Sequence, residues 1–242
     1  MSSVKEIRSV RNACTLVEAV AEHQPLGVSE LARLTGIDKS AAHRLAVTLH
    51  RAGWLDPTDE GRWRISTTLA RRTRRSAVAA LTAAMRPRME ALRDQTGETV
   101  MLVAIDHARL MVHDVVESRQ ALRITTPAEA ELPLVGASGA RAIAAYLPRE
   151  ELAALRRAHP ALDDEEALAP VRRRGWAVND GEVVAEARAV AAPILTSDGY
   201  PLAALVVFGP RSRMTAARMR EYGALAVKAA QERLASQRVA VR

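Results

Sequence analysis

The chain has 242 residues, 48% hydrophobic and 26% charged, so it is long enough for two globular domains and is not expected to be disordered. Its single cysteine, Cys14, excludes an intramolecular disulfide and a cysteine-based metal cluster, which fits a reducing compartment. No segment has the pattern of a secretory signal, and no apolar run is long enough to cross a bilayer. We therefore expect a cytoplasmic protein without a membrane partner.

The formal net charge of +7 favours a polyanionic partner, and most of the excess is local. Residues 67–95 alone carry a net charge of +5, and this stretch contains Arg71, Arg72, Arg74 and Arg75. These arginines are expected either to lie along phosphates or to form the solvated face of a linker helix. Aromatic residues make up only 3% of the chain, which disfavours stacking on single strands. Double-stranded DNA is therefore the predicted polyanion.

Residues 13–36 have the pattern of two amphipathic helices. In the first, apolar residues recur at i, i+3, i+4, i+7 and i+8 from Ala13, before Pro25 and Gly27 close it. The second is short, with Ser29 as the predicted N-cap and Gly36 at its end. The next residues form a turn of helix-turn-helix length, and Asp38 is placed to cap the helix that follows.

A third helix, over residues 39–52, is predicted to read the DNA sequence. Its expected inward stripe is Ala42, Leu45, Leu49 and Ala52. The N-terminal end and outer face of such a helix enter the major groove. The residues expected to contact DNA from this helix are Lys39, Ser40, His43, Arg44 and Arg51.

A β-hairpin is predicted directly after this helix, with strands near 54–56 and 62–65. Alternation turns Trp63 and Ile65 inward and Arg62 and Arg64 outward, where arginines suit phosphate or minor-groove contact. A hairpin in this position is the wing of a winged helix-turn-helix. The alternative is a helical packing module whose charges only provide solubility, but the order of elements within 66 residues favours the winged motif.

The rest of the chain predicts mixed strands and helices. A helix over 69–95 is expected to be kinked or divided at Pro87. The elements that follow are expected as a hairpin of strands at 98–105 and 109–117, helices at 138–146, 149–157 and 164–174, strands at 190–195 and 201–208, and a helix at 215–236. The predicted fold class is α+β. The predicted domains are a winged helix-turn-helix over 1–66, a basic linker helix over 67–85 and an α/β effector-binding domain over 86–242.

An ordered set of short segments resembles the IclR-type transcriptional regulators along nearly the whole chain. In the first part the segments are Ser29-Glu30-Leu31-Ala32, Lys39-Ser40, His43-Arg44-Leu45, Ala52-Gly53-Trp54-Leu55 and Gly61-Arg62-Trp63-Arg64-Ile65. In the second part they are Thr96-Gly97-Glu98-Thr99-Val100, Leu132-Pro133-Leu134, Gly175-Trp176-Ala177-Val178-Asn179-Asp180, Ala191-Ala192-Pro193 and Phe208-Gly209-Pro210. The resemblance implies a GAF-like second domain, a homodimer or dimer of dimers, and a pseudo-palindromic operator.

The resemblance also implies where an effector binds. Residues 136–140 precede a helix; read alone they are an ordinary loop, whereas in IclR-type proteins this loop lines the pocket. The implied effector-binding residues are Gly136, Ala137, Ser138, Gly139, Ala140, Asn179, Ala189, Val206 and Phe208. The chain departs from the family at Ala189, Val206 and Phe208, where polar groups are usual, and at Val135, Ala140 and Arg141. An apolar or aromatic effector, or a pocket that has lost its function, is therefore expected.

The alternative function is a small-molecule hydrolase or metal-dependent enzyme with an accessory helical domain. The sequence has no phosphate loop, dinucleotide fingerprint or zinc-binding helix, and the segment around Ser138 lacks the last glycine of a nucleophile elbow. Four residues of metal-ligand type lie close together in the sequence, namely Asp106, His107, His113 and Asp114. A hairpin turn and a solvent-exposed strand face explain them more simply. We therefore predict a DNA-binding regulator controlled by a small molecule, with no catalytic residue, metal or cofactor. An architectural DNA binder would leave most of the chain without a role.

Overall fold

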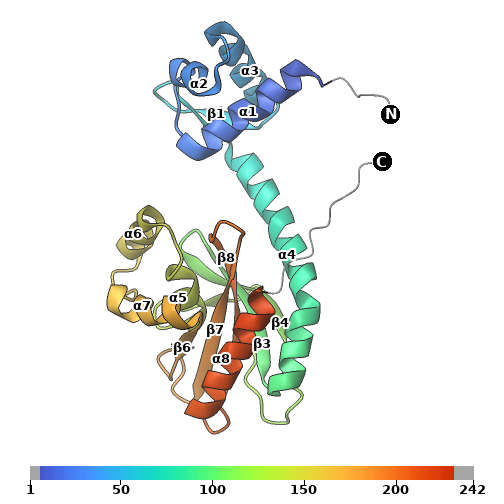
Figure 1. The fold of residues 1–242 in the computed structure, drawn as a ribbon, viewed down its shortest axis with the longest axis vertical. Helices are drawn as coiled ribbons and strands as arrows, with labels where there is room; N and C mark the ends of the chain where they lie inside the picture. Colours follow the sequence, from blue (N-terminus) through green and yellow to red (C-terminus); the bar gives the residue numbers. More distant parts are fainter. Residues whose placement is uncertain (1–5, 232–242) are drawn as a thin grey trace. The chain divides into compact units, whose positions relative to one another are not determined.

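The computed structural model of the chain describes residues 6–231, with the backbone alone for residues 71–78. The chain forms two compact units, Met1–Ala79 and Ala80–Arg242 (Figure 1). Helix α4 (Thr67–Thr96) begins in the first unit and ends in the second. The basic linker predicted over residues 67–85 is therefore the first part of a longer helix.

The first unit has the predicted winged helix-turn-helix order. Helices α1 (Arg8–His23), α2 (Val28–Thr35) and α3 (Lys39–Arg51) are followed by the antiparallel strands β1 (Leu55–Pro57) and β2 (Trp63–Ile65). Trp63 also pairs with Leu26, so the wing is joined to the segment before α2. One apolar core contains residues of all three helices and both strands, including Leu16, Leu31, Leu49 and Leu55. Its burial holds the short elements together.

The predicted helix caps are partly correct. Asp38 caps α3 as predicted, because one of its carboxylate oxygens accepts hydrogen bonds from the amides of Ser40 at 2.9 Å and Ala41 at 3.1 Å. The prediction for Ser29 is wrong. Helix α2 begins at Val28, and its N-cap residue is Gly27, whose amide donates to the Glu30 carboxylate at 2.8 Å. The glutamate three residues into the helix therefore replaces a capping hydroxyl.

Pro87 was predicted to kink or divide the helix, and the division is wrong, because α4 continues through Pro87 as one helix. Pro87 is exposed, whereas the stripe formed by Met85, Met89 and Leu92 is buried in the second unit. A proline on the solvent face leaves its unpaired carbonyl partner accessible to water, while the apolar stripe stabilises the helix on its other side. Burial of the stripe therefore outweighs the missing backbone hydrogen bond.

A six-stranded antiparallel sheet forms the centre of the second unit. Its strand order is β5-β4-β3-β8-β7-β6, with β3 (Thr99–Asp106), β4 (Arg109–Val116), β7 (Ala187–Leu195) and β8 (Pro201–Pro210) as the long strands. The short strands β5 (Glu131–Leu132) and β6 (Ala177–Asn179) were absent from the prediction, because so few residues show no alternation. The four long strands agree with those predicted.

Helices cover both faces of this sheet. One apolar cluster packs the end of α4 and α8 (Ala216–Gln231) against one face. The other cluster packs α5 (Ser138–Ala144), α6 (Arg149–Ala158) and α7 (Glu165–Arg174) on the opposite face (Figure 1). Side chains alternate between the two faces, so Val100 and Leu102 face α4 while Met101 and Val103 face α5. The predicted helix over 215–236 is confirmed to Gln231, and its remaining residues lie outside the described part.

At Gly223, which has no side chain, helix α8 packs closely against the indole of Trp176. A Cβ atom on Gly223 would lie 2.3 Å from the nearest ring atom, and Arg174 covers the indole ring at 4.2 Å from its centroid. Alanine is favoured over glycine inside a helix by about 1 kcal/mol, so Gly223→Ala would stabilise the protein if there were room. We expect instead a loss of about 1–3 kcal/mol in the free energy of unfolding, measured with urea.

The control for this variant is Ala224→Gly, at the neighbouring exposed position of α8. It should cost only the helix-propensity difference of about 1 kcal/mol. A Gly223→Ala protein more stable than the parent would contradict the packing described here.

Candidate DNA-binding surface and effector pocket

Helix α3 presents a polar face to solvent. Ala42, Ala46 and Leu49 form its buried stripe. Of the four residues predicted to face inward, Ala42 and Leu49 are buried, Leu45 is half-buried and Ala52 is exposed. The exposed face and N-terminal end carry all five residues predicted on this helix to contact DNA, namely Lys39, Ser40, His43, Arg44 and Arg51. Within residues 6–70 and 79–231, these five side chains have no hydrogen-bond or ion-pair partner of their own. They are available to an external ligand.

The wing differs from its prediction at one arginine. Trp63 is buried and Arg64 is exposed, as predicted. Arg62 was predicted to point outward, where it would suit a phosphate; its side chain is 36% exposed, but its guanidinium is occupied within the domain. Its guanidinium donates to the Pro25 carbonyl at 2.9 and 3.1 Å and forms an ion pair of 2.8 Å with Glu30. Hydrogen bonds from the Gly27 amide and then from Arg62 lower the pKa of the Glu30 carboxyl, so the pair is charged at neutral pH.

Arg62 therefore connects the wing to the start of α2, where alternation alone had predicted a free side chain. Glu30 lies near Arg62 only in the folded domain, and their separation in sequence gave no signal for the pair. The side chains of Arg71, Arg72, Arg74 and Arg75 lie outside the described residues.

A cavity of about 210 Å³ opens in the second unit between the sheet and the segments beside α5. Seven of the nine residues predicted to bind an effector line it, and they are Ala137, Ser138, Gly139, Asn179, Ala189, Val206 and Phe208. The two others, Gly136 and Ala140, do not line it. Ala140 is fully buried in the core, and Gly136 uses its carbonyl to accept a 2.6 Å hydrogen bond from the Asn179 amide.

Gly139 sets how closely α5 approaches the sheet. A Cβ atom at this position would lie 2.6 Å from a methyl group of Val103 and 3.2 Å from one of Val206. Only glycine therefore allows α5 to pack against β3 and β8 at this distance. Asn179 is bonded to the loop before α5 through the hydrogen bond that its amide donates to the Gly136 carbonyl. Its side-chain oxygen accepts a second hydrogen bond, from the Gly181 amide at 3.1 Å.

Sequence reasoning missed more than half of the cavity wall. Met101 and Val103 on β3 face inward two residues apart, a period-two signal that identifies them in retrospect. Residues of two loops, at 124–126 and 183–184, gave no periodic signal. The further wall residues are Leu110, Ile124, Thr125, Thr126, Leu132, Val183, Val184, Ala187 and Arg188.

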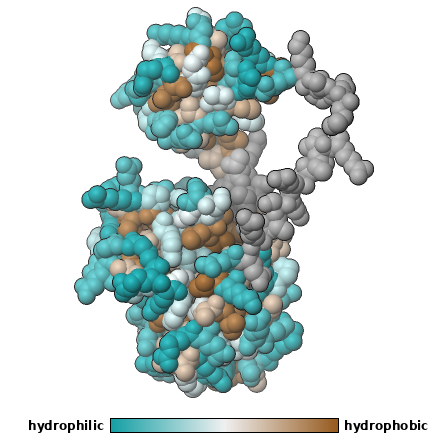
Figure 2. All heavy atoms as spheres, in the orientation of Figure 1, coloured by the Kyte–Doolittle hydropathy of each residue, from teal (hydrophilic) through white to brown (hydrophobic). Residues whose placement is uncertain are grey.

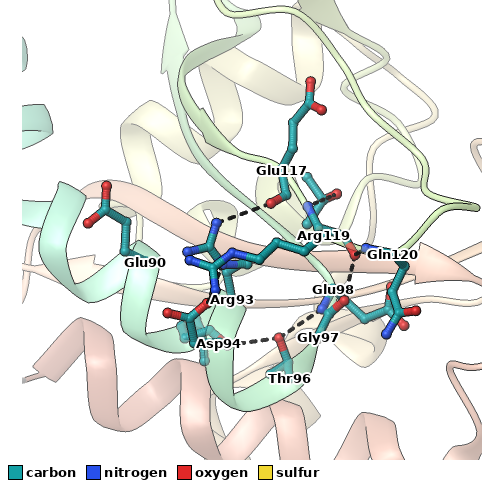
Figure 3. Close-up of polar contacts among 12 residues, drawn as sticks. Glu90, Arg93, Asp94, Thr96, Gly97, Glu98, Glu117, Arg119 and Gln120 are labelled. Carbon is teal, nitrogen blue, oxygen red and sulfur yellow. Dashed lines mark hydrogen bonds and ion pairs between the residues drawn. The ribbon is translucent and has the colours of Figure 1, made fainter.

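Buried polar groups form hydrogen bonds that position the loop carrying Ile124. The Thr99 hydroxyl donates to the Ile124 carbonyl at 2.8 Å and accepts from the Ser118 amide at 3.1 Å. The Ser118 hydroxyl in turn donates to the Gly97 carbonyl at 2.6 Å, just after the end of α4. This part of the second unit also contains an Arg93 hydrogen bond to the Glu117 carbonyl (Figure 3). One wall of the cavity is thus fixed to the end of α4.

The enzyme and metal alternatives find no support in this geometry. Asp114 pairs with Arg86 at 2.7 Å, and among the residues that the structure describes no group of three or more His, Cys, Asp or Glu side chains is placed to hold a metal ion. The Ser138 hydroxyl has no hydrogen-bond partner, and hence no hydrogen-bonded base, among the described residues. None of the described helices has the length and apolar character to span a membrane. On the face in Figure 2, the described surface is mostly hydrophilic with small apolar patches.

Two family models match consecutive parts of the chain. The model described as "IclR helix-turn-helix domain" matches residues 9–59, and the model described as "Bacterial transcriptional regulator IclR C-terminal" matches residues 76–234. The "Transcriptional repressor IclR" of Escherichia coli is 29% identical, with 94% of this chain and 89% of the relative covered.

Two solved structures are similar over nearly the full chain. A putative IclR-family transcriptional regulator of Rhodococcus sp. has a TM-score of 0.71 at 24% identity, with 96% of each chain covered. Pseudomonas aeruginosa HmgR has a TM-score of 0.55 at 27% identity, with 93% of this chain and 95% of that chain covered.

Proposed function

Since this chain belongs to the IclR family and is a DNA-binding transcriptional regulator, we propose that α3 reads its operator and that the second-unit cavity holds its effector. The observation that carries the DNA part is the set of polar side chains on the exposed face of α3 that have no partner among the described residues. Recognition helices in this motif place such side chains against base edges in the major groove. Lys39, Ser40, His43 and Arg44 would set the sequence read.

The remaining basic residues would add affinity without sequence preference. Arg51 lies at the end of α3 and Arg64 on the wing, and both are exposed. Contacts from such residues to phosphates depend on salt, because they release counterions from the duplex. Arg62 has a different part in this proposal: its bonds to Pro25 and Glu30 orient the wing.

Effector control would act on the spacing of two DNA-binding units. Family members such as this one are expected to act as a dimer or a dimer of dimers on a pseudo-palindromic operator in the cytoplasm. An effector that prefers one arrangement of the two units changes operator affinity. The lining of the cavity supports an apolar or aromatic effector, because Ala189, Val206 and Phe208 place no polar group in it.

Arg44→Ala tests the assignment of α3. It should lower the preference for operator over random duplex by about 1–3 kcal/mol, with a smaller change on random DNA. Arg64→Ala is the matched control, since loss of a phosphate contact should weaken binding to both DNAs alike. The measurement is a salt-resolved binding titration against DNA upstream of the gene, or a genomic fragment pool. Equal losses on both DNAs for Arg44→Ala would remove Arg44 from sequence reading.

A further inference from the structure

The charge and hydrogen-bonding state of the cavity wall indicates which kind of molecule fits it. Most of the wall is apolar, including Met101, Leu110, Ile124 and Phe208. Five polar side chains also line it, and they are Ser138, Asn179, Arg188, Thr125 and Thr126. A ligand's polar groups bind strongly only where such side chains have unused hydrogen-bonding capacity.

Arg188 is the one charged side chain among the described residues of the wall, and its guanidinium is already engaged in hydrogen bonds within the domain. Its guanidinium forms a pair with the Asp180 carboxylate at 2.6 and 3.3 Å and donates to the Met214 carbonyl at 3.0 Å. The side chain is 18% exposed, so little of it faces open solvent. A carboxylate ligand would therefore lose its hydration without gaining a free cation, which is unfavourable in an apolar cavity.

Two of the other polar side chains are also occupied. The Asn179 amide donates to Gly136, and its oxygen accepts from Gly181. The Thr125 hydroxyl donates to Glu117 at 2.8 Å. Thr126, half-buried, has a hydroxyl without a partner among the described residues.

Ser138 is the most buried of the polar wall residues whose hydroxyl has no partner among the described residues. It is 2% exposed and lines the cavity, and its hydroxyl has no hydrogen-bond partner in the part of the chain that is described. A hydroxyl can donate and accept, so it suits a neutral hydroxyl or carbonyl group of a ligand. Because Ser138 lines the cavity, an occupant that carries such a group would supply a partner for this hydroxyl.

We propose that this cavity takes an uncharged aromatic or alicyclic molecule with one hydroxyl or carbonyl group bonded to Ser138. This inference rests on the proposal that the cavity is the effector site. The apolar wall would supply most of the affinity, through burial of the ring, and Ser138 would orient it. The occupied Arg188 would exclude anions of the same shape.

Calorimetry on the full chain at neutral pH tests this with three molecules that share one ring system: 2-naphthol, naphthalene and 2-naphthoate. We expect 2-naphthol to bind most tightly and 2-naphthoate at least about tenfold more weakly, because its charge is unpaired in the cavity. Ser138→Ala should weaken 2-naphthol about 3- to 10-fold, the effect of one hydrogen bond, and leave naphthalene unchanged. Ser212→Ala, at an exposed serine that does not line the cavity, is the matched control and should leave all three affinities unchanged.

Three results would overturn the proposal: tighter binding of 2-naphthoate than of 2-naphthol, an equal effect of Ser138→Ala on naphthol and naphthalene, or no binding of any of the three. Urea unfolding of Ser138→Ala checks that the variant is folded. Because the assay contains no DNA, it separates ligand chemistry from effector control. If 2-naphthol binds as expected but does not change operator affinity, the ligand class holds and the proposed control by this cavity fails.

Discussion

Replacing Arg213 with alanine is expected to lower the free energy of unfolding of the second unit by about 3–5 kcal/mol, among the largest effects of any single change. Arg213 forms two parallel hydrogen bonds to the Glu98 carboxylate, at 2.6 and 2.7 Å. The Glu98 side chain is only 3% exposed, so the variant would leave a buried carboxylate without its cation. The hydrogen bond that the Arg213 guanidinium donates to Glu98 raises the pKa of Arg213, so the arginine stays charged.

Arg211→Ala is the matched control for this variant. Arg211 is 48% exposed and lies 3.4 Å from Asp180, so its removal should change stability by less than about 1 kcal/mol. Urea unfolding of both variants gives the comparison. Arg213 also donates to the Leu122 carbonyl at 2.9 Å, so amides of residues 118–126 should exchange faster in Arg213→Ala. A loss of less than about 1 kcal/mol would contradict the stabilising role assigned to this pair.

Much of the DNA-binding unit could be predicted because its signals are local. The cap at Asp38, the turn before it and the apolar spacing of α3 all lie within a few residues of each other. The errors arose where distant segments meet. Arg62 reaches Glu30 across the fold, and Pro87 is tolerated because the far side of its helix is buried. Alternation and propensity do not contain these contacts.

The residues that line the cavity were also predicted only in part. Seven of the nine residues implied by the family resemblance line it, although composition and spacing alone favoured an ordinary loop before α5. The loops that carry Ile124 and Val183 have no periodic pattern, and buried polar bonds position the first of them. Thr99 and Ser118 make those bonds across about twenty residues, a distance at which sequence spacing gives no signal. Loops positioned by a sheet are where binding residues commonly lie.

Arg141→Ala is expected to have an effect of similar size near the loop that carries the wall residues Val183 and Val184. Arg141 is 15% exposed and joins three segments: it pairs with Asp163 at 2.8 Å and Glu182 at 3.2 Å, and it donates to the Val178 carbonyl. Asp163 is only 12% exposed, so the variant should lose about 3–5 kcal/mol by urea unfolding. Amides of residues 180–186, which include the wall residues Val183 and Val184, should exchange faster.

The double replacement distinguishes the Arg141 pair from the Arg213 pair. In the Arg141 pair, Arg141 Nε and Asp163 Oδ2 are buried and have no hydrogen-bond partner in the part of the chain that the structure describes, whereas both Glu98 oxygens are bonded to Arg213. A buried pair with unsatisfied atoms gains less from its charges than it loses in desolvation. Arg141→Met with Asp163→Leu should therefore recover most of the stability lost in Arg141→Ala, while Arg213→Met with Glu98→Leu should recover less. Equal recovery in the two double variants would mean that the unsatisfied atoms carry no cost.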